Sequence, residues 1–444
     1  MSTYAQRRAA LLDSLAGGAG SAGLAKRTSS NLFRYGAWHR PRGQLDLSAF
    51  DHCLAVDRQA GTLEVEGLAT FERIVDTTLP HGLIPPVTPE LKHITIGGAI
   101  VGIGIESNGF RHGFVHDALL EADVMLPDGR VVLATADNEH AMLFRALPNS
   151  YGTLGYILRA KIRLIPAVPY VHLRTTPVDS VERFLADLQA ATERDDVDFV
   201  EGLFFDERRL YVMVSRFARQ VPHVDDILRQ HVFYRLVQAR PDVYLDTKSY
   251  LFRYDPEWFW NLPESLPYRL FRRYAPENLR NSGFYKRYTA RKHAWRARLG
   301  LRSGDHSMEP LIQDWEVPWD QAAPFIRFAL REVDLAGRPW IVTPIRTRRA
   351  PTLYPVTPNR LYCNLGCYCH VRRAEGREDF WHTKVMDSEC FARGGIKMLY
   401  SSTFLPQQEF ERIYNGRGYA EAKARYDPQR RAPALYDKVV YRPQ

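Results

Sequence analysis

A chain of 444 residues with 45% hydrophobic and 12% aromatic side chains is long enough to bury a large core, which excludes a fibrous or disordered protein. Its formal net charge of +9 is distributed unevenly along the chain. The first 40 residues contain only short apolar runs, so we expect neither a membrane-spanning helix nor a signal peptide there. Five cysteines, an odd number, then indicate reduced thiols in the cytosol.

Short strands and a helix are the first elements that the sequence predicts. Residues 51–57 and 62–66 alternate apolar and polar side chains on either side of a turn at 59–61, as paired strands do. Residues 71–78 have the apolar spacing of a helix. We therefore expect a small lobe at the start of the chain that begins with paired strands.

The most unusual segment is 89–107, an apolar run that contains four glycines. Glycines in such a run indicate that the backbone comes close to another group. The main-chain N–H groups of Thr95, Gly98 and Gly102 would form a concavity suited to phosphate oxygens, although a plain loop or a β-bulge is the alternative. The third glycine of a Rossmann fingerprint is missing, so the segment does not predict that fold.

The next predicted elements are again strands and a helix, followed by a second glycine cluster. Residues 122–133 predict two strands joined by an Asp-Gly turn, and residues 138–147 have helical spacing. A second glycine cluster at 151–157 leads into a predicted strand at 160–166. This order of elements resembles the FAD-binding domain, of the PCMH type, in the FAD-linked oxidoreductases related to vanillyl-alcohol oxidase.

Seven segments narrow the likeness within that superfamily: 89–91, 95–98, 102–107, 152–155, 199–203, 397–400 and 435–438. On these segments the sequence resembles the Δ24-sterol reductase family, over most of its length from about residue 50. Residues 26–34 are more similar to the bacterial relatives of that family, some of which reduce a methylene branch on a membrane fatty acyl chain.

The resemblance implies an α+β protein with three parts. A two-lobed PCMH-type FAD-binding domain would span residues 1–168, and an α+β substrate domain would span 169–407. A C-terminal helical segment, 408–444, would pack back near the FAD domain. In the substrate domain, residues 180–194 predict an amphipathic helix, and 197–205 and 209–215 predict strands.

FAD is the cofactor that the resemblance implies, and it would be bound non-covalently, because no Gly-Gly-His stands in the first loop. That loop would be 28–31, although it lacks the usual glycines. The positions that we assign to FAD are Thr28, Ser29, Ser30, Asn31, Pro89, Glu90, Thr95, Ile96, Gly97, Gly98, Gly102, Ile103, Gly104, Ile105, Glu106, Ser107, His112, Gly113, Gly152, Thr153, Gly155, Tyr156 and Ile157.

The activity implied by the resemblance is reduction of a carbon-carbon double bond in a hydrophobic lipid, a methylene-branched acyl chain or a sterol side chain, with NADPH or NADH as electron donor. An FAD-linked oxidase or dehydrogenase of an alcohol or sugar is an alternative. A non-catalytic protein that binds lipid surfaces is another, although the intact glycine loops argue against it.

An isolated alkene needs an acid, because no carbonyl group helps the hydride to arrive. Glu201 is one candidate, since burial in the apolar strand 198–205 would raise its pKa and keep it protonated. Tyr400 is the second candidate. The structural alternatives are that Glu201 pairs with an arginine and that Tyr400 is a core tyrosine bonded to a carbonyl group.

Three cysteines lie close together at Cys363, Cys367 and Cys369. Strand alternation places all three on one face without the paired spacing of a zinc knuckle, so we expect buried strand cysteines and no metal site.

Residues 268–302 hold many arginines and lysines interleaved with aromatic residues. Such a segment fits the anionic headgroups of a membrane, while an ordinary solvated surface or a phosphate-rich partner is the alternative. We do not expect nucleic acid to be the partner. The sequence therefore predicts a cytoplasmic protein with peripheral attachment to the inner face of the membrane.

Overall fold

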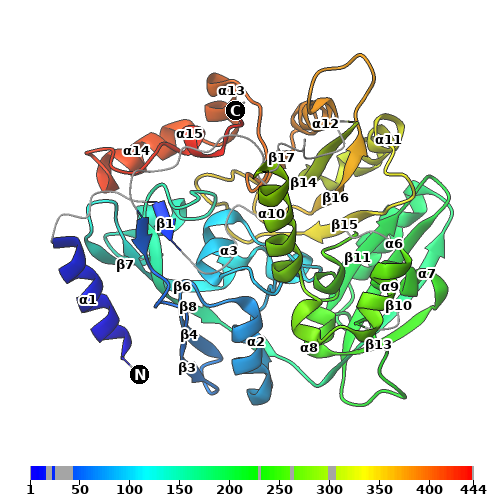
Figure 1. Ribbon diagram of the computed structural model, residues 1–444, viewed down its shortest axis with the longest axis horizontal. Coiled ribbons are helices and arrows are strands. Elements are labelled where there is room, and N and C mark those ends of the chain that lie inside the picture. Colours follow the sequence, from blue (N-terminus) through cyan, green and yellow to red (C-terminus); the bar gives the residue numbers. More distant parts are fainter. Residues whose placement is uncertain are drawn as a thin grey trace.

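The computed structural model describes residues 2–16, 23–25, 44–228, 232–260, 265–298 and 307–442, and two antiparallel sheets organise them (Figure 1). The five-stranded sheet has the order β3 (Cys53–Asp57), β4 (Thr62–Glu66), β8 (Tyr156–Arg163), β6 (Leu119–Met125) and β7 (Val131–Thr135). The eight-stranded sheet has the order β13 (Asp242–Asp246), β10 (Tyr170–Val178), β12 (Leu210–Ala218), β11 (Phe199–Phe204), β15 (Trp340–Ile345), β16 (Tyr362–Arg372), β14 (Met308–Pro318) and β17 (Ile396–Lys397).

Helices accompany both sheets. Those of the first part are α1 (Tyr4–Ala16), α2 (Phe71–Thr78), α3 (Ile96–Gly102), α4 (Gly109–His112) and α5 (Ala141–Ala146). Those of the second part are α6 (Val181–Thr192), α7 (Phe233–Ala239), α8 (Thr247–Leu251), α9 (Leu266–Tyr274), α10 (Ser282–Arg298), α11 (Ala322–Glu332) and α12 (Trp381–Ala392). The chain ends in α13 (Gln407–Ile413), α14 (Gly416–Tyr426) and α15 (Leu435–Val439), and two short pairs complete it, β1 (Gly23–Ala25) with β2 (Gln44–Asp46) and β5 (Leu83–Ile84) with β9 (Ile165–Pro166).

Local sequence signals account for most of the five-stranded sheet. Gly61 and Gly129 have positive φ angles of 61° and 92° in the turns that join β3 to β4 and β6 to β7, as the predicted hairpins require. Thr70 caps α2 by accepting a hydrogen bond from the amide of Arg73. The predicted strands and the helix at 71–78 are confirmed.

Two predictions for this part of the chain are wrong in detail. Residues 96–102 form a helix, α3, instead of a loop or a bulge. Strand β8 begins at Tyr156, four residues before the predicted start, because Tyr156 and Ile157 pair with Met125 and Val124 of β6. Pairing between distant strands sets this boundary, and local periodicity does not show it.

Helices α6, α11 and α12 cover one face of the eight-stranded sheet. Helix α6 confirms the helix predicted at 180–194; Ser180 caps it, and the buried apolar side chains of the helix contribute about 1.5–3 kcal/mol each. A Cβ atom on Gly202 would lie 2.3 Å from the Phe184 ring, so β11 packs tightly against α6 there. Side chains alternate along a strand, so Glu201 points to the opposite face.

The C-terminal helices return to the five-stranded part of the molecule, where Figure 1 draws them in red. Helix α14 contacts α5, and Lys423 Nζ donates a hydrogen bond of 2.7 Å to the carbonyl oxygen of Thr153. None of the helices within the described ranges has both the length and the apolar character needed to cross a bilayer.

Candidate functional site

Ionisable side chains gather on the face of the eight-stranded sheet that α6, α11 and α12 leave uncovered. Trp315 points toward the helices, because its indole N–H donates to Asp387 of α12. Its neighbours on β14, Asp314 and Glu316, therefore point to the other face, as Glu201 does on β11. All three carboxyl groups are buried there.

Arg253, which follows α8, lies at the centre of the first group. Its guanidinium bonds both carboxyl oxygens of Glu201 at 3.0 and 2.8 Å and one oxygen of Glu106 at 2.9 Å. Glu90 lies 3.4 Å away. The Arg253 side chain is fully buried, and its planar fork suits such bidentate pairing. We call these four residues the Arg253 cluster.

Burial and the neighbouring charges together set the pKa values of the side chains in the Arg253 cluster. Burial raises the pKa of Glu201, and Arg253 opposes that rise. Burial and the neighbouring Glu106 raise the pKa of Glu90 well above its usual value. The carboxylates outweigh the effect of burial on Arg253 and raise its pKa further, so it stays charged. The structural alternative for Glu201, pairing with an arginine, is confirmed.

A second group surrounds Asp314. The hydroxyl groups of Tyr400 and Tyr368 donate to its two carboxyl oxygens, each at 2.7 Å. Next to it, the amide of Asn364 donates to Glu316 at 3.2 Å. We call these five residues the Asp314 cluster. Tyr400 is thus bonded to a carboxyl group, and the expected bond to a carbonyl group is wrong.

Among the described residues, no cation pairs with the carboxyl group of Asp314 or with that of Glu316. Burial raises the pKa of Asp314 to about 6, although hydrogen bonds from both tyrosines oppose the rise. Burial and the charge of Asp314 raise the pKa of Glu316 well above its usual value, and one Glu316 oxygen has no hydrogen-bond partner. Both acids therefore keep a proton to a higher pH than usual, and such groups can serve in acid catalysis.

The Asp314 cluster adjoins the glycine-rich segment. Tyr151 donates a hydrogen bond of 3.1 Å to the carbonyl oxygen of Gly102 and also acts on the pKa of Tyr400. Glu90 acts on the pKa of Tyr368. The glycine-rich segment and the two candidate acids, which are far apart in the sequence, therefore meet between the two sheets.

Amides at the start of α3 have hydrogen-bond partners within the protein, and of the three amides expected to bind phosphate (Thr95, Gly98 and Gly102) this includes that of Gly98. The amides of Ile96 and Gly97 donate to the carbonyl oxygens of Ala69 and Gly67, each at 2.9 Å. The amide of Gly98 donates to its capping residue Thr95 at 3.3 Å. A Cβ atom on Gly97 would lie 2.7 Å from the Gly67 oxygen, so glycine is needed there for close packing of the backbone.

The outer face of α3 does fit a cofactor. Gly98, Val101, Gly102 and Ile105 are only half buried, although most of their neighbours are buried. Nearby, the 149–153 loop presents buried polar atoms without partners, including the hydroxyl of Ser150. A dinucleotide with an aromatic ring system would cover the apolar face and supply partners for such atoms.

Other positions assigned to FAD have structural reasons for their residue types. Gly113 has a φ of 75°, and a Cβ atom there would lie 2.1 Å from the Asp117 carboxylate. Gly152 and Gly155 also have positive φ angles. A Cβ atom on Gly104 would lie 2.6 Å from Val115, and Ile103 ends α3 with a φ of 57°. These contacts leave the FAD assignments as predictions.

The remaining positions assigned to FAD do not lie together in the structure. His112 lies near Arg111, and burial together with the nearby arginines lowers its pKa to about 4. Tyr156 packs in the small cluster beneath α1, away from the two acidic clusters. Ser107 donates to Glu106, Thr153 donates to the Ser150 carbonyl oxygen, and Pro89, Ile96 and Ile157 are buried. Thr28, Ser29, Ser30 and Asn31 lie outside the described residues.

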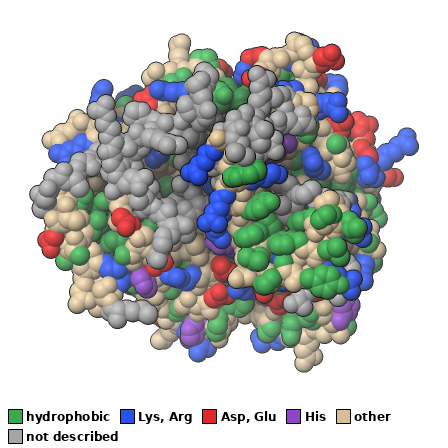
Figure 2. Space-filling model, in the orientation of Figure 1, with side chains coloured by type: hydrophobic (Ala, Val, Ile, Leu, Met, Phe, Trp, Pro, Cys, Tyr) green, Lys and Arg blue, Asp and Glu red, His purple; other side chains and the backbone are tan. Residues whose placement is uncertain are grey.

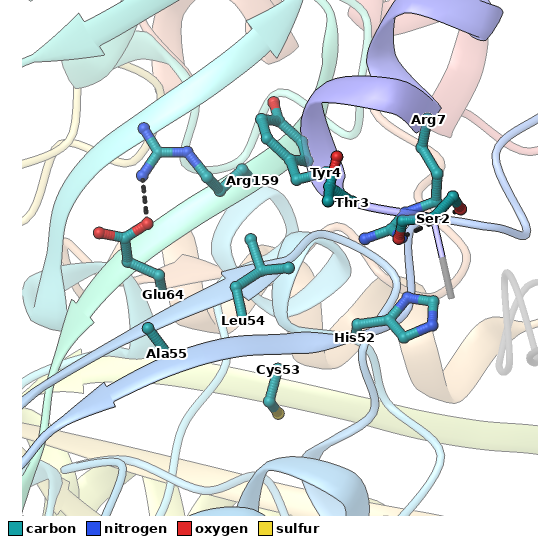
Figure 3. Close-up of a pocket in the computed structure, with 10 residues that line it drawn as sticks. All are labelled: Ser2, Thr3, Tyr4, Arg7, His52, Cys53, Leu54, Ala55, Glu64 and Arg159. Carbon is teal, nitrogen blue, oxygen red and sulfur yellow. Dashed lines mark hydrogen bonds and ion pairs between the residues drawn. The ribbon is translucent and has the colours of Figure 1, made fainter.

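A pocket of about 530 Å³ opens elsewhere, between the start of α1 and the edge of the five-stranded sheet (Figure 3). Its polar lining includes His52, Glu64 and Arg159, and Arg159 bonds Glu64 at 3.2 Å. None of the positions assigned to FAD or to catalysis lines this pocket.

Cys363, Cys367 and Cys369 lie on β16 and are buried, as predicted for strand cysteines. The sulfur atoms of Cys367 and Cys369 are 3.7 Å apart, and burial raises the pKa of the Cys363 thiol. In the ranges that the structure describes, no three His, Cys, Asp or Glu side chains are grouped as metal ligands.

Sequence reasoning missed Arg253, Asp314, Glu316, Tyr368 and Asn364. Asp314 and Glu316 did carry a usable signal, because they are acids within an apolar strand, as Glu201 is. Arg253 carried no such signal, since its partners lie 52 to 163 residues away in the sequence.

Comparisons with known proteins agree with this architecture. A family model described as an FAD-binding domain matches residues 28–135. The Delta(24)-sterol reductase of Homo sapiens is 27% identical over 91% of this chain and 79% of its own, and that of Arabidopsis thaliana is 26% identical over 90% and 76%. Cytokinin dehydrogenase 10 of Oryza sativa subsp. japonica is 29% identical over 40% of this chain and 36% of its own. The chain therefore contains an FAD-binding domain and is a homologue of the Delta(24)-sterol reductases over most of its length.

Proposed function

We propose that this protein is an FAD-dependent oxidoreductase that reduces a carbon-carbon double bond in a hydrophobic lipid. The full-length similarity to Delta(24)-sterol reductases and the FAD-binding domain support this activity. The observation that carries the proposal is the Asp314 cluster, a buried acid with two tyrosines and no paired cation among the described residues, next to the glycine-rich segment.

FAD would bind non-covalently along the outer face of α3, where Gly98 and Gly102 are only half buried. The 149–153 loop would contribute polar atoms, and the two-lobed arrangement of the FAD-binding domain is part of the same proposal. NADPH or NADH would supply the electrons. When bound and reduced, FAD supplies a hydride to an electron-poor carbon.

The proton would come from Tyr400, with Asp314 as its source. Tyr400 now donates to Asp314, and protonation of Asp314 reverses this bond, because the carboxyl group then carries the hydrogen. The Tyr400 hydroxyl is then available to donate to an alkene carbon while Asp314 replaces the proton. The positive character that develops on the more substituted carbon favours a branched alkene, such as a methylene-branched acyl chain or a sterol side chain.

Glu201 would then act as a positioning residue. Its bidentate pairing with Arg253 connects β11 to the segment after α8, and Glu106 connects the same arginine to the glycine-rich segment. This cluster holds the elements around the site in place, and Tyr400 is the better candidate for the proton donor.

An anaerobic experiment tests the proposed activity. The purified yellow protein is reduced with NADPH, or with NADH, and then mixed with a methylene-branched phospholipid or a desmosterol-type sterol. Reoxidation of the flavin by one of these alkenes, with formation of the saturated lipid, is the expected result. A colourless protein that cannot take up FAD would disprove the enzyme assignment.

Oxidation of an alcohol or sugar is the second candidate function. The partial similarity to a cytokinin dehydrogenase favours it, because that protein is named as a dehydrogenase. Rapid reoxidation of the reduced flavin by oxygen, with no response to either alkene, would support this second function.

A cytoplasmic location with peripheral attachment to an anionic membrane completes the proposal. Unpaired cysteines agree with a reducing compartment, and a lipid substrate would be drawn from a bilayer.

A further inference from the structure

Exposed apolar side chains are concentrated on two helices. Seven large hydrophobic side chains are exposed among the described residues, and five of them lie on α9 and α10. Their exposed fractions are 66% for Leu266, 51% for Leu270, 73% for Tyr274, 60% for Tyr288 and 62% for Trp295. A patch of this kind on a folded protein marks an interaction site.

Aromatic rings connect the exposed side chains of α9 to Tyr288 on α10. Leu266, Leu270 and Tyr274 are spaced by four residues and lie on one side of α9. Rings connect this side to α10, since Phe271 stacks on Phe284 with centroids 6.2 Å apart, and Phe284 stacks on Tyr288 at 6.4 Å. Figure 2 shows the hydrophobic side chains gathered on this face with basic side chains beside them.

Cations surround this apolar surface, and they fall into two groups. Arg272 and Arg280 point inward, where Arg272 pairs with Glu257 at 2.7 Å and Arg280 donates to the Leu228 carbonyl oxygen. The outer group is exposed, and its members are Arg269, Arg273, Arg287, Arg291, Lys292 and Arg298. Between residues 265 and 298, Glu277 is the single acidic residue in the sequence.

The two helices are fixed to the candidate site. Ser282, at the start of α10, donates to Asp255 at 2.6 Å, and the same carboxylate accepts the amide of Lys92 at 3.0 Å. The next residue, Gly283, packs so closely on His93 that a Cβ atom would lie 3.1 Å from its ring. The helices are thus attached between the Arg253 cluster and the glycine-rich segment.

We propose that α9 and α10 form a docking face for the surface of an anionic phospholipid bilayer. The leucines and aromatic rings would enter the headgroup region, and the outer cations would pair with lipid phosphates. Nucleic acid would use the cations but not the exposed leucines, so it is the weaker fit. Delivery of lipid from this surface to the site rests on the proposed function, whereas docking itself does not.

Vesicle flotation of the full FAD-loaded chain tests the docking face. We expect binding to vesicles of phosphatidylcholine with phosphatidylglycerol, and at least about tenfold weaker binding to phosphatidylcholine alone. The double variant L270S/Y274S should lose about tenfold in binding to the anionic vesicles, and R269E/R273E should lose a similar factor and most of the salt dependence.

The two other exposed hydrophobic residues provide the matched control, because L133S/V224S should bind vesicles as the unchanged protein does. Flavin absorbance and turnover of detergent-dispersed lipid should be the same in all of these variants, which separates docking from the enzyme assignment. Equal flotation of all variants would overturn the proposal. Failure of the FAD-loaded protein to bind anionic vesicles, or tighter binding to a duplex DNA probe at the same salt concentration, would also overturn it.

Discussion

The Arg253 cluster and the Asp314 cluster lie against the same face of one sheet, and each holds a buried carboxyl group on a strand, yet they differ in one respect. Three carboxylates of the Arg253 cluster share a guanidinium. Asp314 is bonded to two tyrosine hydroxyls, and no cation of the described residues reaches it. Burial raises the pKa of both Glu201 and Asp314, but at Glu201 the paired Arg253 opposes the rise, whereas at Asp314 only hydrogen bonds do.

This difference assigns separate roles to the two clusters. A buried ion pair is costly to break, so the Arg253 cluster connects β11, the glycine-rich segment and the segment after α8. The Asp314 cluster can hold a proton near neutral pH and can pass it through a tyrosine. Of the two candidate acids that the sequence suggested, Glu201 belongs to the Arg253 cluster and Tyr400 to the Asp314 cluster.

The strongest test removes the proton path. Tyr400→Phe and Asp314→Asn should each lower the turnover of the alkene by about 10²- to 10⁴-fold, because each removes a group that carries the proton. The measurement is the anaerobic rate at which the lipid alkene reoxidises the reduced flavin. Reduction of the flavin by NADPH should be much less affected, because that step needs no proton on the alkene.

Tyr426→Phe is a matched control, since Tyr426 is a buried tyrosine on α14 whose hydroxyl has no hydrogen-bond partner in the described part of the chain. It should retain full turnover. If Tyr400→Phe also retains full turnover while it binds FAD normally, the Asp314 cluster is not the proton source.

A variant in the Arg253 cluster should show the opposite result, a loss of stability with little loss of turnover. Glu201→Gln removes a charged partner of Arg253, and we expect a loss of roughly 1–3 kcal/mol in the free energy of unfolding. Turnover by the folded, FAD-loaded variant should stay close to normal. Denaturant unfolding and the same reoxidation assay measure the two effects.

Glu64→Gln is the control for this variant, because Glu64 pairs with Arg159 near the protein surface. It should cost less than about 1 kcal/mol. A large loss of turnover in Glu201→Gln, with unchanged stability, would reverse the roles of the two clusters.

A change of pH should alter turnover less than the substitutions at Tyr400 and Asp314 do. The proton path needs protonated Asp314, whose pKa is raised to about 6. Turnover should therefore be constant below about pH 6 and should fall by up to tenfold for each further pH unit.

The same proton affects stability. The folded state binds it more tightly than the unfolded state does, so the stability that Asp314 contributes is present at low pH and is lost as pH rises toward 6. In Asp314→Asn, both the residual turnover and the stability should lose this dependence; a rate that rises above pH 6 would contradict it.

Local patterns were sufficient for much of the fold. Helices α2 and α6 were predicted because their apolar spacing is a local signal, which lies within a few residues of the chain. Helix α3 was not predicted, because its glycines have low helix propensity and its packing against Gly67 stabilises it instead. The clusters were missed for the same reason, since Arg253 and Asp314 acquire their partners only when distant segments meet. The FAD positions stay predictions, because the sequence pattern does not separate a glycine that packs from a glycine that borders a ligand.

Variants at Gly97 and Gly102, beside the clusters, can distinguish a glycine that is needed for packing from a glycine that borders a ligand. A methyl group on Gly97 would meet the Gly67 oxygen, so Gly97→Ala should lower stability by about 1–3 kcal/mol. On Gly102 it would contact only the Tyr151 ring, at 3.6 Å, and alanine favours a helix, so Gly102→Ala should be as stable as the unchanged protein. The added methyl group should nevertheless weaken FAD binding several-fold, because it projects where we expect the flavin to lie beside Tyr151 and Tyr400. Flavin titration of the apoprotein, followed by absorbance, measures this affinity; unchanged FAD binding in Gly102→Ala would place the flavin away from the Asp314 cluster and remove the link between that cluster and the cofactor.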